Sequence, residues 1–176
     1  MIETDRLILA QWRDEHRAPI AAINADPEAM KYFVAPMSRA ESDAQVDRQI
    51  ASQAANGFCF WAIERKSDGV LMGLCGLKTG APGTPIEHDV EIGWRFDRDF
   101  WGKGYASEAA RAALAHGLTD PAVPRIGSIT VPSNRASWAV MERIGMTRAH
   151  DLDFDHPAVP LGHPLRRHVT YFIDRR

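Results

Sequence analysis

The sequence predicts an α/β (α+β) fold in which residues 1–176 form a single domain. The chain has 176 residues, of which 45% are hydrophobic and 25% charged, values typical of a folded, water-soluble domain. Three apolar segments of strand length lie close together in the first half. The second half alternates strand and helix patterns without a linker or an internal repeat.

The N-terminal part of the chain is expected to contain one strand and two helices. Residues 6–12 (RLILAQW) form a short apolar run typical of a strand. The polar, alanine-bearing region 14–55 is interrupted by Pro27 and Pro36, which predicts two helices rather than one. Ser38 and Glu41 have the spacing of a capping box, so the second helix is expected to begin there and to run toward Gly57.

The remaining elements follow in a regular order. Turn compositions (KSDG and TGAPGTPIE) separate three apolar segments, and this pattern predicts a three-stranded meander. The expected strands lie at 58–65, 70–78, 88–96, 125–131, 146–155 and 168–173, and the expected helices at 106–118 and 134–144.

Composition and charge exclude several classes of protein. The formal net charge is -2 and no Lys/Arg cluster is interleaved with aromatic residues, so nucleic acid is not an expected partner. The first residues lack the basic start and apolar stretch of a signal peptide, and no apolar run approaches the 18 or so residues of a membrane span. Cys59 and Cys75 lie in apolar segments and are expected to be buried free thiols. These features predict a cytoplasmic protein that does not bind membranes.

The motif WGKGYA (101–106) raises the question of phosphate binding. Gly102 and Gly104 precede a helix whose predicted inner face is mostly alanine, and the free N–H groups of a helix N-terminus bind anions. Lys103 is followed by Gly104 rather than Ser or Thr, and Ser107 stands where a dinucleotide fingerprint requires a third glycine or an alanine. ATP and NAD loops are therefore excluded. Taken alone, the motif also fits an ordinary strand-to-helix turn.

Four separate segments together extend this interpretation. The segments ETDRLILAQW, EIGWRFDRDFWGKGYASEA, NRASWAVMERIGM and HVTYFI resemble the GNAT acetyltransferases, in the branch of ribosomal-protein N-terminal acetyltransferases. The resemblance implies a single mixed, mainly antiparallel twisted sheet with helices on both faces and a splayed central strand pair. It also implies acetyl-CoA as cosubstrate and no metal.

The resemblance also implies which residues hold the cosubstrate. Backbone N–H groups of the glycine turn would cover the pyrophosphate, although Trp101 stands where the family usually has Arg or Gln. The strand before the turn would run beside the pantetheine arm. Asn134, at the start of the expected helix 134–144, would contact the arm or hold a water; the alternative is an ordinary helix cap. These candidates are Trp94, Arg95, Phe96, Trp101, Gly102, Lys103, Gly104, Tyr105, Ala106 and Asn134.

Two residues are the candidates for proton transfer. Glu91 lies in the middle of a predicted central strand, where burial would raise its pKa toward that of a general base; the alternative is a structural carboxylate paired with Lys or Arg. His88 and Asp89 are second choices. The resemblance implies that Ser137 protonates the leaving thiolate, whereas the alternative is a bond to the carbonyl four residues earlier. Backbone N–H groups near Gly93 and Trp94 are the expected oxyanion donors.

Other residues give weaker signals. The histidines of the 156–168 region lack metal-ligand spacing, so no metal site is predicted. Acidic residues alternate in the expected strand 146–155, which favours a half-exposed edge able to attract a cationic amine. Four aromatic residues are candidates for an acceptor pocket or for the core. These residues are His156, His163 and His168; Asp151, Asp153 and Asp155; and Trp12, Tyr32, Phe33 and Trp138.

The expected function is N-acetylation of a primary amine by direct attack on acetyl-CoA in a ternary complex. The acceptor is either a protein N-terminus or a small molecule, and the protein is expected to be a monomer or a homodimer. The alternative is a non-catalytic acyl-CoA-binding module, because a glycine turn alone does not require a working base or acid.

Overall fold

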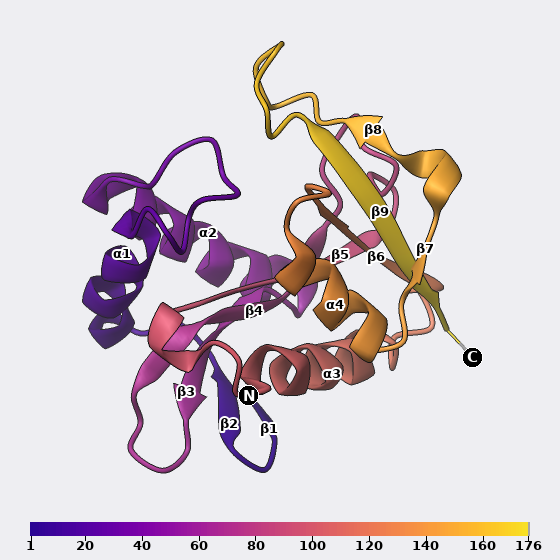
Figure 1. Ribbon diagram of the computed structural model, residues 1–176. Helices are drawn as coiled ribbons and strands as arrows, with labels where there is room; N and C mark the ends of the chain where they lie inside the picture. The colour runs from indigo at the N-terminus through magenta and orange to yellow at the C-terminus, as the bar shows by residue number, and fades with distance from the viewer. Residues whose placement is uncertain (176) are drawn as a thin grey trace.

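A computed structural model describes residues 1–175, which form one mixed sheet with helices on both of its faces (Figure 1). The strands follow the order β1-β2-β3-β4-β5-β6-β9-β7, and β8 also pairs with β9. The strands are β1 (Ile2–Glu3), β2 (Leu7–Ala10), β3 (Phe60–Arg65), β4 (Leu71–Thr79), β5 (Val90–Phe96), β6 (Arg125–Thr130), β7 (Thr147–Arg148), β8 (Phe154–Asp155) and β9 (Arg167–Asp174). The helices are α1 (Arg17–Ala25), α2 (Arg39–Asn56), α3 (Tyr105–Gly117) and α4 (Arg135–Arg143), with short 3-10 turns at Asp14–His16, Arg98–Phe100 and His150–Leu152.

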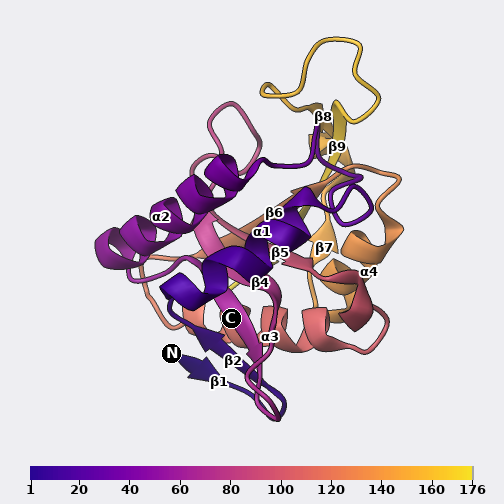
Figure 2. The same cartoon turned by 90° about the vertical axis from the view of Figure 1, so that its left-hand side faces the viewer.

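The two faces of the sheet are covered by different halves of the chain. Helices α1 and α2 pack together, and α1 contacts β4 from one side (Figure 2). Helix α3 packs on β2, β4 and β5 from the other side and contacts α4. The predicted arrangement of helices on both faces of a mainly antiparallel sheet is confirmed. Among the described residues, no helix combines the length and the apolar composition needed to span a bilayer.

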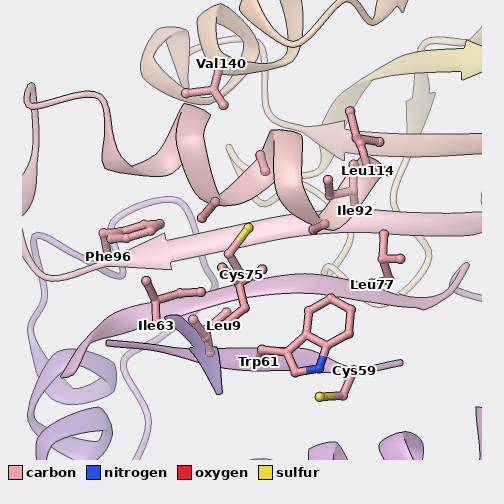
Figure 3. Close-up of a cluster of buried hydrophobic side chains, with 14 of the residues drawn as sticks. Leu9, Cys59, Trp61, Ile63, Cys75, Leu77, Ile92, Phe96, Leu114 and Val140 are labelled. Carbon is pink, nitrogen blue, oxygen red and sulfur yellow. The ribbon is translucent and has the colours of Figure 1, made fainter. Parts of the chain in front are cut away.

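The core lies between α3 and the predicted meander. Strands β3, β4 and β5 pair antiparallel in sequence, and their apolar side chains meet α3 around Cys75 and Ile92 (Figure 3). The alanine stripe of α3 permits close approach, since Ala109, Ala110 and Ala113 are fully buried. A Cβ atom on Gly117 would lie 2.6 Å from the Cδ1 atom of Leu77, so a larger residue would force this side chain to shift.

The two strands at the centre of the sheet separate along their length. Parallel pairing between β5 and β6 is confined to Val90 with Ile126 and Glu91 with Gly127. Beyond Glu91, β5 remains paired with β4 as far as Phe96, while β6 remains paired with β9. The predicted splayed pair is therefore present, and the gap between its strands opens just after Glu91.

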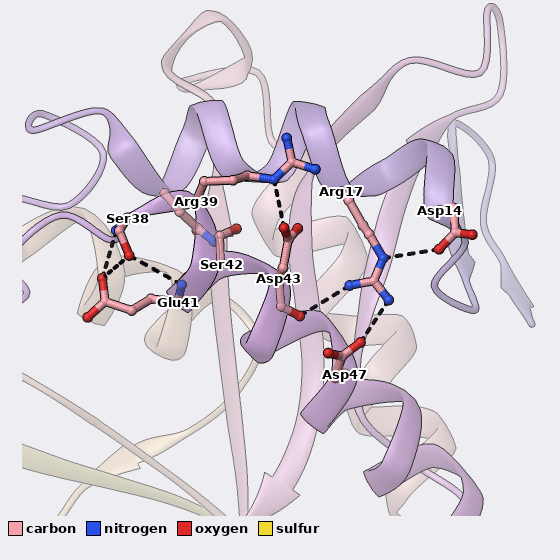
Figure 4. A network of polar contacts seen from close by, with 9 residues as sticks. Asp14, Arg17, Ser38, Arg39, Glu41, Ser42, Asp43 and Asp47 are labelled. Atoms are coloured by element: carbon pink, nitrogen blue, oxygen red, sulfur yellow. Dashed lines mark hydrogen bonds and ion pairs between the residues drawn. The ribbon is translucent and has the colours of Figure 1, made fainter.

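Helix α2 has the predicted limits, and it forms a polar interface with α1. Ser38 accepts a hydrogen bond from the backbone N–H of Glu41, whose carboxylate accepts one from the Ser38 N–H, and Gly57 ends α2 at a φ of 75°. Arg17 then joins the two helices, since its guanidinium donates to Asp47 at 2.7 Å and to the Asp43 carbonyl (Figure 4).

The prediction of one continuous strand at 146–155 is wrong. The segment contains β7, a 3-10 turn at His150–Leu152 and β8, and both strands pair with β9. The Ala149 N–H donates to the Thr170 carbonyl, and the chain then turns away from the sheet. Leu152 is 37% exposed, so its place in the alternating pattern does not bury it.

Candidate active site

The open edge of β5 forms one wall of the gap. The Ile92 carbonyl accepts a hydrogen bond of 2.9 Å from the Ser128 hydroxyl of β6, so this carbonyl faces the gap. Backbone polar groups of alternate residues in a strand point to the same side, and the N–H and C=O groups of Trp94 therefore also face it. Phe96 follows the same alternation, and its carbonyl accepts from the Trp101 indole at 2.9 Å. Where β6 has moved away, the backbone groups of Trp94 thus have no partner strand.

The glycine turn lies at the end of this edge. Gly102 and Gly104 have φ angles of 73° and 82°, conformations that side chains rarely adopt. Gly104 is the N-cap of α3 and supplies no side chain, so the first N–H groups of the helix remain available to an anion. The Lys103 ammonium donates to the Asp99 carbonyl at 2.7 Å. The turn therefore offers its backbone, and Lys103 bonds to the turn itself.

The first turn of α3 also carries an acidic residue that sequence reasoning missed. Glu108 lies beside the positive end of the helix and forms a 2.6 Å ion pair with Arg6. Arg6 also donates to the Lys103 carbonyl at 3.1 Å and lies 4.3 Å above the Tyr105 ring. These contacts join the residue just before β2 to the glycine turn and to the first turn of α3. The hydrogen bonds of Glu108 hold its pKa below the usual value despite partial burial.

Glu91 lies at the other end of the gap, at the point where β5 and β6 part. Its carboxylate is 3.0 Å from the Lys78 ammonium, which is directly opposite on β4. Burial raises the pKa of Glu91, and the positive charge of Lys78 opposes that increase. The structural pairing considered from the sequence therefore exists, and it coexists with the burial that a general base requires.

The second-choice bases lie before the gap opens. Asp89 accepts two hydrogen bonds from Arg125, at 2.7 and 3.2 Å, and only 10% of its side chain is exposed. The His88 side chain is 91% exposed and lies beside Glu87. Asp89 is thus occupied by a cation, and His88 faces solvent.

Helix α4 starts on the β6 side of the gap. The side-chain oxygen of Asn134 accepts a hydrogen bond from the Ser137 N–H at 3.2 Å. The side-chain NH₂ group of Asn134 donates one to the Thr130 hydroxyl at 3.1 Å. Asn134 is therefore a helix cap. The Ser137 hydroxyl is half-buried and makes no hydrogen bond within residues 1–175. The carbonyl four residues earlier, that of Ser133, accepts from Tyr32 instead at 3.2 Å.

The connection between α1 and α2, residues 26–37, crosses from one wall of the gap to the other, and we name it the covering segment. Asp26 forms a 2.8 Å ion pair with Arg98, just before the glycine turn. Tyr32 reaches the Ser133 carbonyl at the start of α4, as described above. The ring of Phe33 lies 4.3 Å from the Arg95 guanidinium. The covering segment therefore spans the site from the turn to α4.

The other aromatic candidates divide between core and site. Trp12 is 7% exposed and donates its indole N–H to the Phe60 carbonyl at 2.7 Å, so it belongs to the core. Trp138 is partly buried on α4 and donates to the Pro132 carbonyl. Tyr32 and Phe33 lie on the covering segment, where Phe33 is 44% exposed.

The acidic and histidine clusters are engaged elsewhere. Asp153 pairs with Arg148 at 2.7 Å, and Asp155 lies 3.5 Å from Arg167. The rings of His156 and His168 are 4.9 Å apart beside Phe154, and burial lowers the pKa of both histidines. Within residues 1–175, no three His, Cys, Asp or Glu side chains are grouped so that they could hold a metal ion.

Comparison with known proteins identifies the family. The model of the Acetyltransferase (GNAT) domain matches residues 6–147. The chain is 30% identical over 148 residues to the uncharacterized N-acetyltransferase YnaD of Bacillus subtilis, a match that covers 84% of this chain and 82% of that protein.

Solved structures give the same fold. A GNAT-family acetyltransferase from Bacillus anthracis superposes with a TM-score of 0.81 at 26% identity, covering 99% of this chain and 98% of that one. RimL, a ribosomal L7/L12 alpha-N-protein acetyltransferase solved with coenzyme A, gives a TM-score of 0.77 at 20% identity and covers 97% and 95% of the two chains. With the splayed strands and the glycine turn already described, these matches show that the chain belongs to the GNAT acetyltransferase family and is an acetyl-CoA-dependent acyltransferase.

Proposed function

We propose that this enzyme transfers the acetyl group of acetyl-CoA to a primary amine by direct attack in a ternary complex. The observation that carries the proposal is the gap between β5 and β6, which opens after the buried Glu91 and extends along β5 toward the glycine turn. One end of the gap thus offers a carboxylate to an amine, and the other offers helix N–H groups to a diphosphate.

The backbone fits the cosubstrate in two places. The C=O group of Trp94 faces the gap and would accept a hydrogen bond from an amide of the pantetheine arm, as a neighbouring strand would supply. The N–H groups from Gly102 to Ala106 surround the start of α3 and would bind the pyrophosphate. Asn134 would position this wall by holding the first turn of α4.

Three groups are proposed to act on the reacting atoms. Glu91 would accept the proton that the amine loses, directly or through water, while the Trp94 N–H stabilises the oxyanion that forms on the thioester carbonyl. The Ser137 hydroxyl, which is free of the carbonyl of its own helix, would protonate the departing thiolate. Each group contributes mainly by position, because the amine attacks the thioester without a covalent enzyme intermediate.

The acceptor is proposed to be a protein N-terminus or a small amine, in the manner of the RimJ/RimL branch. The fold neighbour RimL acts on a ribosomal protein, which favours a peptide. The covering segment and α4 form the other side of the gap and would contact that acceptor.

The test is thiol release from acetyl-CoA across a panel of peptides and small amines. Wild-type protein should release thiol only when a suitable amine is present. Glu91→Gln should lower kcat by about 10²–10⁴-fold, the usual contribution of a general base, with acetyl-CoA binding retained. Ser137→Ala should lower kcat, whereas Ser133→Ala, a change at an exposed neighbouring serine, should not. Full activity of either catalytic variant would remove that residue from the mechanism.

The competing function is a non-catalytic acyl-CoA-binding module. It is supported by the ion pair of Glu91 with Lys78, which would suffice to explain a buried carboxylate. Calorimetry separates the two functions: tight acetyl-CoA binding with no thiol release for any amine would favour the binding module.

A further inference from the structure

Arg95 is a buried cation without an anionic partner. It is 8% exposed and lies on β5 between Trp94 and Phe96, with its side chain on the opposite face from theirs. Its Nη1 atom donates to the Asn24 side-chain oxygen of α1 at 2.5 Å, and the Phe33 ring lies 4.3 Å from the guanidinium. Among residues 1–175, no carboxylate forms an ion pair with Arg95.

One edge of this guanidinium is unused. Nε is completely buried and has no hydrogen-bond partner. Nη2 also makes no hydrogen bond within the described residues, and Nε and Nη2 together form the fork that binds a carboxylate through two parallel bonds. The free edge therefore has the donor pattern that binds a carboxylate.

Only two contacts oppose the burial of this charge. Withdrawing an ion from water carries a desolvation penalty. The Arg95 guanidinium meets one neutral amide oxygen and one aromatic ring but no carboxylate. Burial lowers the pKa of Arg95 to about 10, so the side chain remains charged at neutral pH. A bound anion would balance a charge that the protein leaves uncompensated.

The surrounding residues hold the receptor in place. Asn24 is fully buried, and its amide donates to Ser42 at 2.8 Å and to Gln45 at 2.9 Å. These two bonds fix the amide so that its oxygen faces Arg95. The guanidinium is thus oriented before any ligand arrives, which lowers the entropic cost of binding.

The position of Arg95 favours the acceptor over the cosubstrate as the source of the anion. Its side chain lies on the α1 face under the covering segment, whereas the glycine turn opens onto α3 on the other face. The neighbouring Trp94 backbone faces the gap where the acetyl group would be transferred. Because Arg95 adjoins Trp94 in β5, an anion at Arg95 would lie near the acetyl group and could belong to a residue close to the reacting amine.

We propose that the Nε and Nη2 edge of Arg95 binds a carboxylate of the acceptor, so that the preferred substrates are amines that also carry a carboxylate one or two residues away. This inference rests on the proposed acetyl transfer and names its substrate class. Arg95 acts in it as a specificity-determining residue, whereas the chemistry remains with Glu91 and Ser137.

The experiment compares acceptors that differ only in that charge. Short peptides with Glu or Gln at the second and third positions, and free or amidated amino acids, form matched pairs for the thiol-release assay. Wild-type enzyme should prefer the carboxylate member by about 10–100-fold in kcat/KM, as expected for a charged hydrogen-bonded pair. Arg95→Met should remove the preference and leave the KM for acetyl-CoA unchanged, and Arg95→Lys should restore it only in part. Arg39→Met, a change at an exposed arginine of α2, should preserve it.

A second measurement separates this inference from the proposed function. Calorimetry with N-acetylated peptides, which cannot react, should show tighter binding of the acid than of the amide by wild type and no difference for Arg95→Met. Circular dichroism would confirm that the variant folds. Equal kcat/KM values for acid and amide in wild type would overturn the inference while leaving acetyl transfer intact. A higher KM for acetyl-CoA in Arg95→Met, with the preference unchanged, would also overturn it. Carboxylate-dependent binding without any thiol release would retain the receptor and reject acetyl transfer.

Discussion

At the scale of single residues, the burial that suits Glu91 to its proposed role also lowers the free energy of unfolding at neutral pH. Burial raises its pKa above the ordinary value of 4.5, so the folded state disfavours the charged carboxylate. This reduces the free energy of unfolding as the pH rises from 4.5 through the raised pKa. Glu91→Gln should therefore be more stable than wild type at pH 7.5 and equal to it near pH 4. Urea denaturation at both pH values checks this, and a variant less stable at pH 7.5 would mean that the Lys78 pair outweighs burial.

Lys78 provides a second prediction at the same scale. Its ammonium opposes the increase in the pKa of Glu91, so Lys78→Met should raise that pKa further. If Glu91 is the base, the acidic limb of the kcat/KM profile should move to higher pH in this variant, as determined by thiol release between pH 5 and 9. Lys66→Met removes a lysine paired with Glu3 at 3.0 Å and should leave the limb in place. An unmoved limb in Lys78→Met would assign it to another group.

At the scale of secondary-structure elements, the glycine turn and the C-terminus of α2 each contain a glycine with the same left-handed backbone conformation. Gly102 and Gly57 have φ angles of 73° and 75°, and a Cβ atom on either would meet nothing within 4 Å. Alanine at each position should therefore cost a similar amount of stability, about 1–2 kcal/mol. Only Gly102→Ala changes the backbone that would bind the pyrophosphate, so only it should raise the KM for acetyl-CoA. Thermal melts and initial rates measure both effects; an equal KM in the two variants would remove the turn from cosubstrate binding.

The elements also show what local sequence signals can predict. The limits of α2 follow from Ser38, Glu41 and Gly57, because capping and left-handed conformations depend on adjacent residues. The stretch 146–155 was predicted as one strand because its apolar residues alternate. The structure divides it, since the turn at His150–Leu152 depends on where β9 pairs and not on the local pattern. Contacts between distant residues, such as Arg6 with Glu108, give no local signal at all.

At the scale of the whole molecule, the site is assembled from segments that only the fold brings together. The sequence indicated the glycine turn, Glu91 and the start of α4 because each lies in a recognisable motif. It did not indicate the Asn24–Arg95 contact, whose residues are 71 positions apart, or that the covering segment reaches Ser133. Resemblance to a family supplied the splayed strands, which no periodicity within one strand can predict. The specificity of the enzyme thus depends on the part of the fold that local patterns predict least well.

The two cysteines report on the integrity of the whole domain. Cys75 is fully buried in β4, and Cys59 is 1% exposed; burial raises the pKa of both thiols, that of Cys59 to about 12. Only a thiolate reacts readily with a disulfide reagent, so native protein should give almost no thiol signal of its own during the acetyl-transfer assay. In denaturing urea both cysteines should react, so the reagent should release two equivalents of its reporter thiol per chain. Labelling of native protein at the rate of global unfolding would confirm one cooperative core around these strands. Fast labelling without unfolding would instead reveal local opening of β3 or β4.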